Sequence, residues 1–328
     1  IILFFIIYSS ICFFPLFLSN CPPSPFNPPV NFEQITLVGV GLLGGSLGLA
    51  VKQRGLARRV VGLVRRPESI DECLALGVVD HATLDAPAAV KGSDLIIHCA
   101  PITQMRALTD AFLPDMEQGA IVTDVGSEKT NVVRNLESLI GNAGGHFVGS
   151  HPMAGGERTG VNGAKADLFQ HATVVIAPTP NSDKSVIEKL TAFWTALGAK
   201  VLKTDPETHD QLVARSSHLP HVVAAALAST VLDPDLPPEL SDVCGPGFRD
   251  ATRIASGSPG MWRDIVIVNR ENIARSLDEL IRQLESVKAS LSANDAEAVE
   301  TFFRTAKERR DDWINSRESQ DSPPQANS

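Results

Sequence analysis

The sequence predicts an α/β protein, with a doubly wound parallel sheet in its N-terminal part and an all-helical domain after it. Three observations lead to this prediction. A glycine-rich turn near residue 40 joins an apolar run to a helix, strand-like runs then alternate with helical segments, and beyond residue 204 helical periodicity takes over. We therefore expect an α/β domain at residues 33–204 and a helical domain at residues 205–314.

The composition is that of a globular protein that acts on small molecules. The chain has 328 residues, of which 43% are hydrophobic and 20% charged, so it has room for two domains and a sizeable core. The net charge of −9 argues against a nucleic-acid partner, which requires an excess of cations. The five cysteines include no Cys-x-x-Cys pair, so neither a metal site nor a disulfide framework is predicted, and a reducing cytoplasm fits.

Residues 1–32 are expected to lie outside the fold. Residues 1–18 are almost entirely apolar and precede a proline-rich stretch. A secretory signal would carry a basic segment, but the first cation is Lys52, and the chain does not begin with Met. About 18 apolar residues is the short end of the membrane-spanning range, which keeps an anchor open. We favour a mis-assigned start upstream of a cytoplasmic protein, with no membrane association.

The glycine-rich turn has the spacing of a dinucleotide-binding turn. Ile35–Val38 are mostly branched and apolar, as in a strand buried on both faces, and Ser46–Gln53 have the pattern of a helix that ends near Gly55. A glycine pattern alone is weak, but the strand before it and the helix after it favour a nucleotide site over a plain tight turn.

Each glycine of the turn has a different expected task. Gly39 permits the tight bend, Gly41 lets the backbone approach a pyrophosphate, and Gly44 lets the helix pack closely on the strand. The helix N-terminus then faces the phosphates with unpaired amides and a partial positive charge. Leu42 and Leu43 complete the turn and are included among the expected cofactor contacts.

The end of the second predicted strand, Val60–Val64, bears on the choice between NAD and NADP. A NAD-binding protein usually has an acid there, which accepts hydrogen bonds from the ribose hydroxyls. In this chain Arg65 and Arg66 follow Val64, and residues 52–66 contain six cations and no acid. Because no carboxylate would repel a 2′-phosphate, NADP is the preferred cofactor and NAD the alternative. A solvated basic surface is the other interpretation of these cations.

The strand predicted at Leu95–Ala100 ends beside the expected cofactor crevice. Parallel strands meet a ligand at their carboxyl ends, and the small Ala100 and the rigid Pro101 suit close contact with a cofactor. His98 lies inside the strand, where a structural role is the better interpretation.

Two candidate catalytic side chains follow later strands. Ser127 comes directly after the strand Ala120–Val125, where it is either functional or the N-cap of the next helix. His151 follows the strand His146–Gly149, so it is expected to project from a loop into the ligand crevice. Imidazole titrates near neutral pH, which suits a general base, although a structural loop histidine has the same spacing.

Helices and two further strands complete the predicted domain. The helices are expected at Pro67–Leu76, Thr130–Ile140 and Lys184–Leu197. The strands Thr173–Ala177 and Lys200–Lys203 are expected to complete the same sheet.

The helical domain has two conspicuous apolar segments. Leu219–Leu232 is apolar on all sides and rich in Ala, which predicts a buried helix with close neighbours. A longer helix carries an apolar stripe, which is either core or a dimer face, formed by Ile273, Leu277, Leu280, Ile281, Leu284 and Leu291. The polar composition of residues 315–328 predicts a disordered tail.

Five motifs, taken in order, resemble those of the prephenate/arogenate dehydrogenase family. They are Gly39-Val-Gly-Leu-Leu-Gly44, Asp124-Val-Gly-Ser-Glu-Lys129, Gly149-Ser-His-Pro-Met-Ala-Gly155, Ser217-His-Leu-Pro-His221 and Phe248-Arg-Asp-Ala-Thr-Arg-Ile-Ala255. The resemblance covers about residues 34–314. It implies an N-terminal Rossmann domain and a helical C-terminal domain that forms a homodimer.

The resemblance implies a reaction and the residues that perform it. The reaction is oxidative decarboxylation of prephenate to 4-hydroxyphenylpyruvate with hydride transfer to NAD(P), in tyrosine biosynthesis. His151 would accept the proton of the ring hydroxyl, and Ser127 would hydrogen-bond His151 and that hydroxyl. Arg253 would bind a substrate carboxylate through its planar guanidinium. The remaining substrate-site positions are Glu157, Ser217 and His221, with Asp250 and Trp262 where the neighbouring subunit closes the site.

The resemblance leaves the substrate open. Prephenate is favoured because family members that are restricted to arogenate often lack the histidine at His221, and arogenate is the alternative. His218, in the same motif, is expected to be structural. A non-catalytic NAD(P)-binding module and a two-domain hydroxyacid dehydrogenase are the other hypotheses, and His151, Ser127 and Arg253 together argue against the former.

Overall fold

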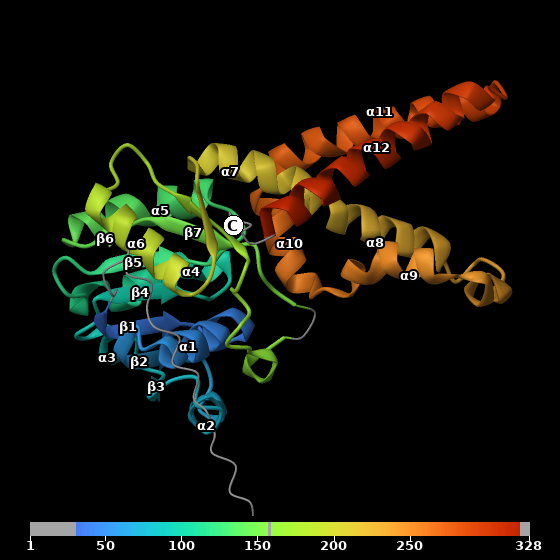
Figure 1. Cartoon of the computed structure of the whole chain (residues 1–328). Coiled ribbons are helices and arrows are strands. Elements are labelled where there is room, and N and C mark those ends of the chain that lie inside the picture. Colours follow the sequence, from blue (N-terminus) through green and yellow to red (C-terminus); the bar gives the residue numbers. More distant parts are fainter. Residues whose placement is uncertain (1–30, 157–158, 322–328) are drawn as a thin grey trace, which may run out of the picture.

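A six-stranded parallel sheet lies at the centre of the N-terminal part of this computed structural model, which describes residues 31–156 and 159–321 (Figure 1). The strand order is β3-β2-β1-β4-β5-β6, and every neighbouring pair is parallel. The strands are β1 Phe32–Val38, β2 Ala57–Leu63, β3 His81–Thr83, β4 Leu95–His98, β5 Ile121–Asp124 and β6 His146–Phe147. This is the order of a dinucleotide-binding Rossmann sheet, so the predicted fold class is confirmed.

Helices cover both faces of this sheet. They are α1 Leu42–Arg54, α2 Glu68–Ala75, α3 Ala86–Val90, α4 Ile102–Phe112, α5 Thr130–Asn142 and α6 Lys184–Ala196. Leu37, Leu95 and Ile97 belong to the hydrophobic cluster on one face, whereas Val38 and Ile96 belong to the cluster on the other. The strands are apolar on both sides because each side is buried against helices.

The later strands form a second sheet, so the expectation that they complete the first one is wrong. Its order is β7-β8-β9, with β7 (Gly149–Pro152) antiparallel to β8 (Thr173–Ala177) and β8 parallel to β9 (Lys200–Lys203). Only Val148 separates β6 from β7. At this junction the backbone N–H of Ser150 donates to the buried carboxylate of Asp124 at 3.2 Å.

The C-terminal part is helical (Figure 1). Its helices are α7 Pro206–Val213, α8 Leu219–Val231, α9 Pro246–Thr252, α10 Pro259–Val268, α11 Arg270–Ser292 and α12 Ala296–Asp321. A π-helical turn, Ala214–His218, joins α7 to α8, and 3-10 turns lie at Pro238–Val243 and Arg253–Ser256. Figure 1 shows α11 and α12 side by side as a long hairpin that projects from the α/β body. Thr103 in α4 donates to Asp264 in α10 at 3.2 Å and thereby connects the two parts.

The apolar helix α8 is not buried within a single chain, contrary to the prediction. Ala224 is its one buried residue, whereas Leu227 is 38% exposed. The stripe on α11 is also exposed in part, with Ile281 at 48% and Leu284 at 55%. These partly exposed apolar side chains are available for contact with another surface.

The chain ends differ in part from the expectations. The helix α12 continues to Asp321 and so includes residues 315–321 of the expected disordered tail, whereas residues 322–328 lie outside the described part. Of the expected N-terminal extension, residues 1–30 also lie outside it. Phe32 belongs to the fold, because its side chain is 1% exposed and packs edge-on against Phe193. No helix within residues 31–156 and 159–321 is long and apolar enough to cross a membrane.

Candidate active site

The glycine turn between β1 and α1 has the geometry of an anion cradle. Gly39 has φ of +97°, and a Cβ there would lie 3.0 Å from the backbone N of Ala100. A Cβ on Gly44 would lie 2.2 Å from the carbonyl O of Gly39, so only glycine lets α1 start this close to the turn. A Cβ on Gly41 would meet no heavy atom within 4 Å. The backbone at Gly41 is therefore open to a ligand.

The N-terminus of α1 is also suited to a phosphate. Its first turn contains no acidic residue, and no side chain caps it. The unpaired amides and the helix dipole favour an anion there. These residues fit a dinucleotide whose pyrophosphate lies against the turn.

Two arginines follow β2 beside this cradle. The register pairs Val38 with Leu63, and the backbone N–H of Gly39 donates to the carbonyl O of Leu63 at 2.9 Å, so the ends of β1 and β2 are adjacent. Arg65 and Arg66 are exposed, and neither forms an ion pair within the described residues. Both guanidinium groups are available to an anionic ligand at this edge.

The candidate base His151 lies in β7, within the second sheet, and not in a loop after a parallel strand. Its ring is 8% exposed, and its Nδ1 lies 2.9 Å from Nε2 of His209, in α7. His209 Nδ1 in turn lies 2.8 Å from Oδ1 of Asp210. These three side chains form a continuous buried chain of hydrogen bonds, which we call the His151–His209–Asp210 chain.

The carboxylate at its end determines the tautomers in this chain. Asp210 accepts from the backbone N–H groups of Lys129 and Thr130, each at 2.8 Å, so it acts as an ionised acceptor. His209 must then donate from Nδ1 to Asp210, which leaves its Nε2 as an acceptor. His151 consequently donates from Nδ1, and its Nε2 carries the free lone pair. A neutral imidazole in this state is prepared to accept a proton.

Burial keeps the histidines of this chain neutral. Desolvation, followed by the nearby His209, Lys129 and His218, lowers the pKa of His151 well below 6.5. Desolvation likewise lowers the pKa of His209, against the opposing effect of Asp210. Burial also acts to raise the pKa of Asp210, but its hydrogen bonds outweigh this effect and hold the pKa below its usual value. Near neutral pH the chain therefore consists of two neutral imidazoles and a carboxylate.

Ser127 is not the N-cap of α5, and it does not hydrogen-bond His151 in this structure. Asp210 and Glu128 occupy the first amides of α5 instead, since Glu128 Oε1 accepts from the N–H of Asn131 at 2.6 Å. The residue that orients His151 is His209, which no sequence motif indicated.

A buried ion pair lies under the same site. Lys129 Nζ donates to Asp124 Oδ2, and both side chains are fully buried. The Asp124 carboxylate also accepts the N–H groups of Gly126 and Ser150. Through the bond from Ser150, Asp124 joins the end of β5 to the start of β7. It thereby holds the second sheet, with His151, against the first.

A cavity of about 430 Å³ adjoins α8, and two of the predicted substrate residues, His221 and Trp262, line it. Trp262 stacks on His221 within the same chain, with ring centroids 3.7 Å apart. The resemblance implies instead that Trp262 acts from the neighbouring subunit. Arg253, in the 3-10 turn that follows α9, lies close enough to contribute, after burial, to the lowered pKa of His221. Asp250 is exposed and 3.8 Å from Arg249.

The remaining predicted residues lie in varied surroundings. Ser217 contributes its carbonyl O to His221 Nδ1 at 2.9 Å. His218 is buried beside Asn269, at 3.1 Å, which agrees with the structural role expected for it. Glu157 lies outside the described residues. Ala100 and Pro101 lie where β4 ends against the glycine turn.

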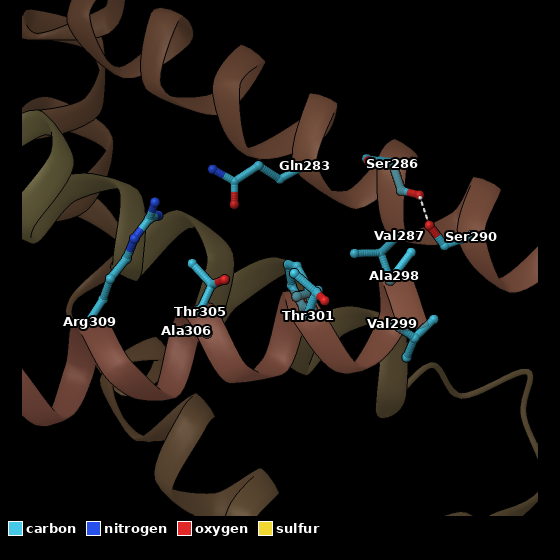
Figure 2. Close-up of a pocket in the computed structure, with 11 residues that line it drawn as sticks. Gln283, Ser286, Val287, Ser290, Ala298, Val299, Thr301, Thr305, Ala306 and Arg309 are labelled. Atoms are coloured by element: carbon cyan, nitrogen blue, oxygen red, sulfur yellow. Dashed lines mark hydrogen bonds between the residues drawn. The ribbon is translucent and has the colours of Figure 1, made fainter. Parts of the chain in front are cut away.

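A further cavity lies away from this site, between α11 and α12 (Figure 2). Its volume is about 410 Å³, and Figure 2 shows polar side chains such as Gln283, Thr305 and Arg309 along its walls. No group that could hold a metal ion occurs among the described His, Cys, Asp and Glu residues.

Known proteins resemble the chain over both of its parts. The family model for the nucleotide-binding domain of prephenate dehydrogenase matches residues 47–203, and the model for its dimerization domain matches residues 205–308. Prephenate dehydrogenase of Bacillus subtilis is 36% identical over 85% of this chain and 76% of its own length. Cyclohexadienyl dehydrogenase of Zymomonas mobilis is 30% identical over 85% of this chain and 95% of its own length.

Solved structures of similar proteins agree with the fold. Prephenate dehydrogenase from A. aeolicus, in complex with hydroxyphenyl propionate and NAD+, superposes with a TM-score of 0.80 and 31% identity, over 85% of this chain and 98% of that one. Synechocystis arogenate dehydrogenase superposes with a TM-score of 0.73 and 28% identity, over 85% and 99%.

Proposed function

Because the chain belongs to the prephenate dehydrogenase family, we propose that it converts prephenate to 4-hydroxyphenylpyruvate and CO2 with reduction of NAD(P), in the biosynthesis of tyrosine. The observation that carries this proposal is the buried His151, whose Nδ1 is engaged by His209 and whose Nε2 is left as a proton acceptor. Oxidation of a ring hydroxyl needs such a base, and the cradle at Gly41 supplies a place for the oxidant's pyrophosphate.

The bound dinucleotide would supply a nicotinamide ring that accepts hydride from the ring carbon bearing the hydroxyl. His151 Nε2 would take the hydroxyl proton, and Asp210, acting through His209, would stabilise the resulting positive charge. Loss of the ring carboxylate as CO2 then makes the product aromatic. In this proposal Ser127 stays a partner for the substrate hydroxyl, because its side chain makes no hydrogen bond within the described residues.

The cofactor would lie along the glycine turn. We assign its pyrophosphate to the backbone of the turn, from Gly39 through Leu42 and Leu43 to Gly44, and its nicotinamide half to the neighbourhood of Ala100 and Pro101. NADP is the preferred form, because Arg65 and Arg66 are exposed after β2. In addition, position 64 is a valine and not the acid that would repel a 2′-phosphate.

The substrate would occupy the cavity beside α8. His221 lines this cavity and Arg253 lies near His221, and a guanidinium and an imidazole suit the carboxylates of prephenate. Ser217 and Glu157 are assigned to the same site. Asp250 and Trp262 are assigned to closing the neighbouring subunit's site in a homodimer, which the match to the dimerization-domain model supports.

Arogenate is the second candidate substrate. The similarity to Synechocystis arogenate dehydrogenase and to a cyclohexadienyl dehydrogenase favours it. The two substrates differ only in a keto or an amino group on the side chain. His221 in the cavity wall is the reason for preferring prephenate.

We also propose the division into domains at residues 33–204 and 205–314, with the protein acting in the cytoplasm. Kinetics of the purified chain with prephenate and with arogenate, each with NAD and NADP, test the proposed activity. We expect reduced nicotinamide and 4-hydroxyphenylpyruvate from prephenate, with the higher kcat/KM for NADP. Absence of turnover in all four combinations would refute the proposal.

A further inference from the structure

Glu128 is a buried acid that the proposed reaction leaves without a role. It follows Ser127 in the motif Asp124–Lys129, and its side chain is 1% exposed. Oε1 accepts from the N–H of Asn131 at 2.6 Å and from its side-chain amide at 2.8 Å. Oε2 is buried without a hydrogen bond of good geometry, and the carboxyl group of Asp210 lies beside it.

Two carboxyl groups therefore meet at one helix end. Asp210 accepts the N–H groups of Lys129 and Thr130, and Glu128 accepts the next one along α5, that of Asn131. Two neighbouring buried carboxylates repel each other, so removing one charge by protonation is favourable. Asp210 already accepts three hydrogen bonds, including the one from His209, and it is the better site for the charge. The proton therefore belongs on Glu128. Apart from the neighbouring Asp210, its Oε2 has no hydrogen-bond partner among the described residues.

We propose that Glu128 shares a proton with Asp210 and thereby sets the proton affinity of the His151–His209–Asp210 chain. This inference rests on the proposed dehydrogenase function. Glu128 acts through Asp210 and the two imidazoles, so it is a positioning residue and not a catalytic one. The sharing moves a proton between two oxygen atoms and changes no covalent bond between heavy atoms.

The charge on Glu128 changes in the pH range where the enzyme would work. Desolvation, followed by the repulsion from Asp210, raises the pKa of Glu128 to about 7, against the effects of Asn131 and Lys129. Below that pH Glu128 is neutral. Above it a second negative charge stands next to Asp210, which stabilises a proton on His209 and His151 and makes His151 the stronger base.

Several other ionisable groups face this helix end. Lys129 forms the buried ion pair with Asp124, whose pKa is raised by burial against the effect of Lys129. His151 and His209 are held neutral by burial, and burial lowers the pKa of His218, which lies beyond α7, to about 4. An ionisation near pH 7 in the rate profile is thus assigned to Glu128 and not to the catalytic histidine.

The experiment is a pH profile of kcat and kcat/KM for prephenate from pH 5.5 to 9, comparing the wild type with Glu128→Gln. Gln remains neutral and can donate to Asp210 as the protonated acid does. We expect the wild-type kcat to rise through pH 7, and the Gln variant to lose this rise, with kcat lower by roughly fivefold to tenfold at pH 8.5 and unchanged at pH 6.

Two further variants make the test specific. Glu128→Asp keeps an ionisable group and should keep the rise at a shifted midpoint. Glu188→Gln removes the same charge from an exposed position on α6 and should leave the profile unchanged. A Gln variant whose rate falls by one factor at all pH values would show a structural role and overturn the proposal.

A measurement without substrate separates this inference from the proposed function. Infrared difference spectra of the wild-type protein between pH 5.5 and 8.5 should contain a protonated-carboxyl band that disappears near pH 7 and is absent from Glu128→Gln. If the wild type turns over neither substrate but has the band, only the proposed function fails. If the wild type is active and no such band titrates, the inference about Glu128 fails. If the Gln variant does not fold, Glu128→Asp identifies the band instead, because its midpoint should shift while other carboxyl bands stay unchanged.

Discussion

At the scale of single residues, the position of one proton on His151 decides whether the site can work. A histidine with Nε2 protonated could not accept the substrate proton there. Asp210 prevents this through His209. Because Asp210 accepts the proton of His209 Nδ1, His209 Nε2 is an acceptor, and His151 must therefore carry its proton on Nδ1. In this proposal His151 is therefore prepared as a base by its partners before any substrate binds.

Replacing His151 with Asn should lower kcat by about 10²-fold or more, because the substitution removes the proposed general base. Binding of the dinucleotide should remain nearly intact, since the glycine turn is unaffected. Steady-state kinetics and fluorescence titration with the reduced cofactor measure the two effects. His81→Asn, at an exposed position in β3, is the matched control and should have wild-type activity. Retained turnover in the His151 variant would exclude His151 as the base.

Replacing Arg65 and Arg66 together with Ala should weaken NADP far more than NAD, by roughly tenfold for each hydrogen bond to the 2′-phosphate that the substitution removes. The ratio of kcat/KM for the two cofactors is the measurement. Arg58→Ala removes a cation of the same cluster, on the outer part of β2, and should not change that ratio. Equal losses for NADP and NAD would mean that the two arginines are surface residues without a role in cofactor choice.

At the scale of elements, the turn before α1 must leave space for a pyrophosphate and must let α1 pack closely on the turn. Substitutions at two different glycines test these two requirements separately. Gly41→Ala fits the free protein, so its Tm should be unchanged, but the new methyl group occupies the space for the pyrophosphate and should weaken the dinucleotide by about tenfold or more. Gly44→Ala brings Cβ against Gly39 O and should lower both Tm and affinity. Calorimetry and a binding titration test the pair. A Gly41→Ala protein that binds the dinucleotide normally would contradict the assigned cradle.

The elements also differ in how well the sequence predicts them. β1 and α1 follow from local patterns, namely a buried apolar run, three glycines and the αL residue Gly55 that ends the helix. The second sheet does not, because its first strand pairs with residues 173–177 and also bonds to the buried side chain of Asp124, and these partners are distant in the sequence. The contact of His209 with His151 could not be predicted either, because it also joins distant parts of the sequence. The role of His209 depends on a partner 58 residues away in the chain.

At the scale of the whole molecule, the helical part has apolar faces that a single chain leaves exposed. Ile281 and Leu284 are 48% and 55% exposed on α11, and Leu227 of α8 is 38% exposed. The sequence predicted that α8 is buried, and it could not show whether the covering helices come from the same chain or from a second one.

Replacing Ile281 and Leu284 together with Glu should convert the proposed dimer to a monomer, because charges on an apolar interface are costly to desolvate. Activity should fall with the dimer fraction if Asp250 and Trp262 complete the neighbouring site. Light scattering and kinetics at several protein concentrations measure this. Glu285→Gln, at an exposed position on the same helix, should leave both unchanged. A variant that stays dimeric would mean that this stripe is not the interface.

Stability should fall as the pH drops below about 6.5, because buried neutral histidines bind protons only on unfolding. Burial lowers the pKa of His98 to about 3 and that of His218 to about 4. Each histidine costs about 1.4 kcal/mol per pH unit between its unfolded and folded pKa values. Glu128, with its pKa raised to about 7, acts in the opposite direction. Urea midpoints at pH 7 and 5 test this, and equal midpoints would contradict it.

Because a single residue separates β6 from β7, the length of this connection determines where the side chain of His151 points. Side chains alternate along a strand, so an insertion after Val148 would shift the register of β7 by one and turn His151 to the side where Ser150 now points. The base would then face Thr123 and the main sheet, away from His209. Chains of this family could therefore diverge widely in surface loops, whereas this junction, with Val148 buried in the core, would tolerate no change in length.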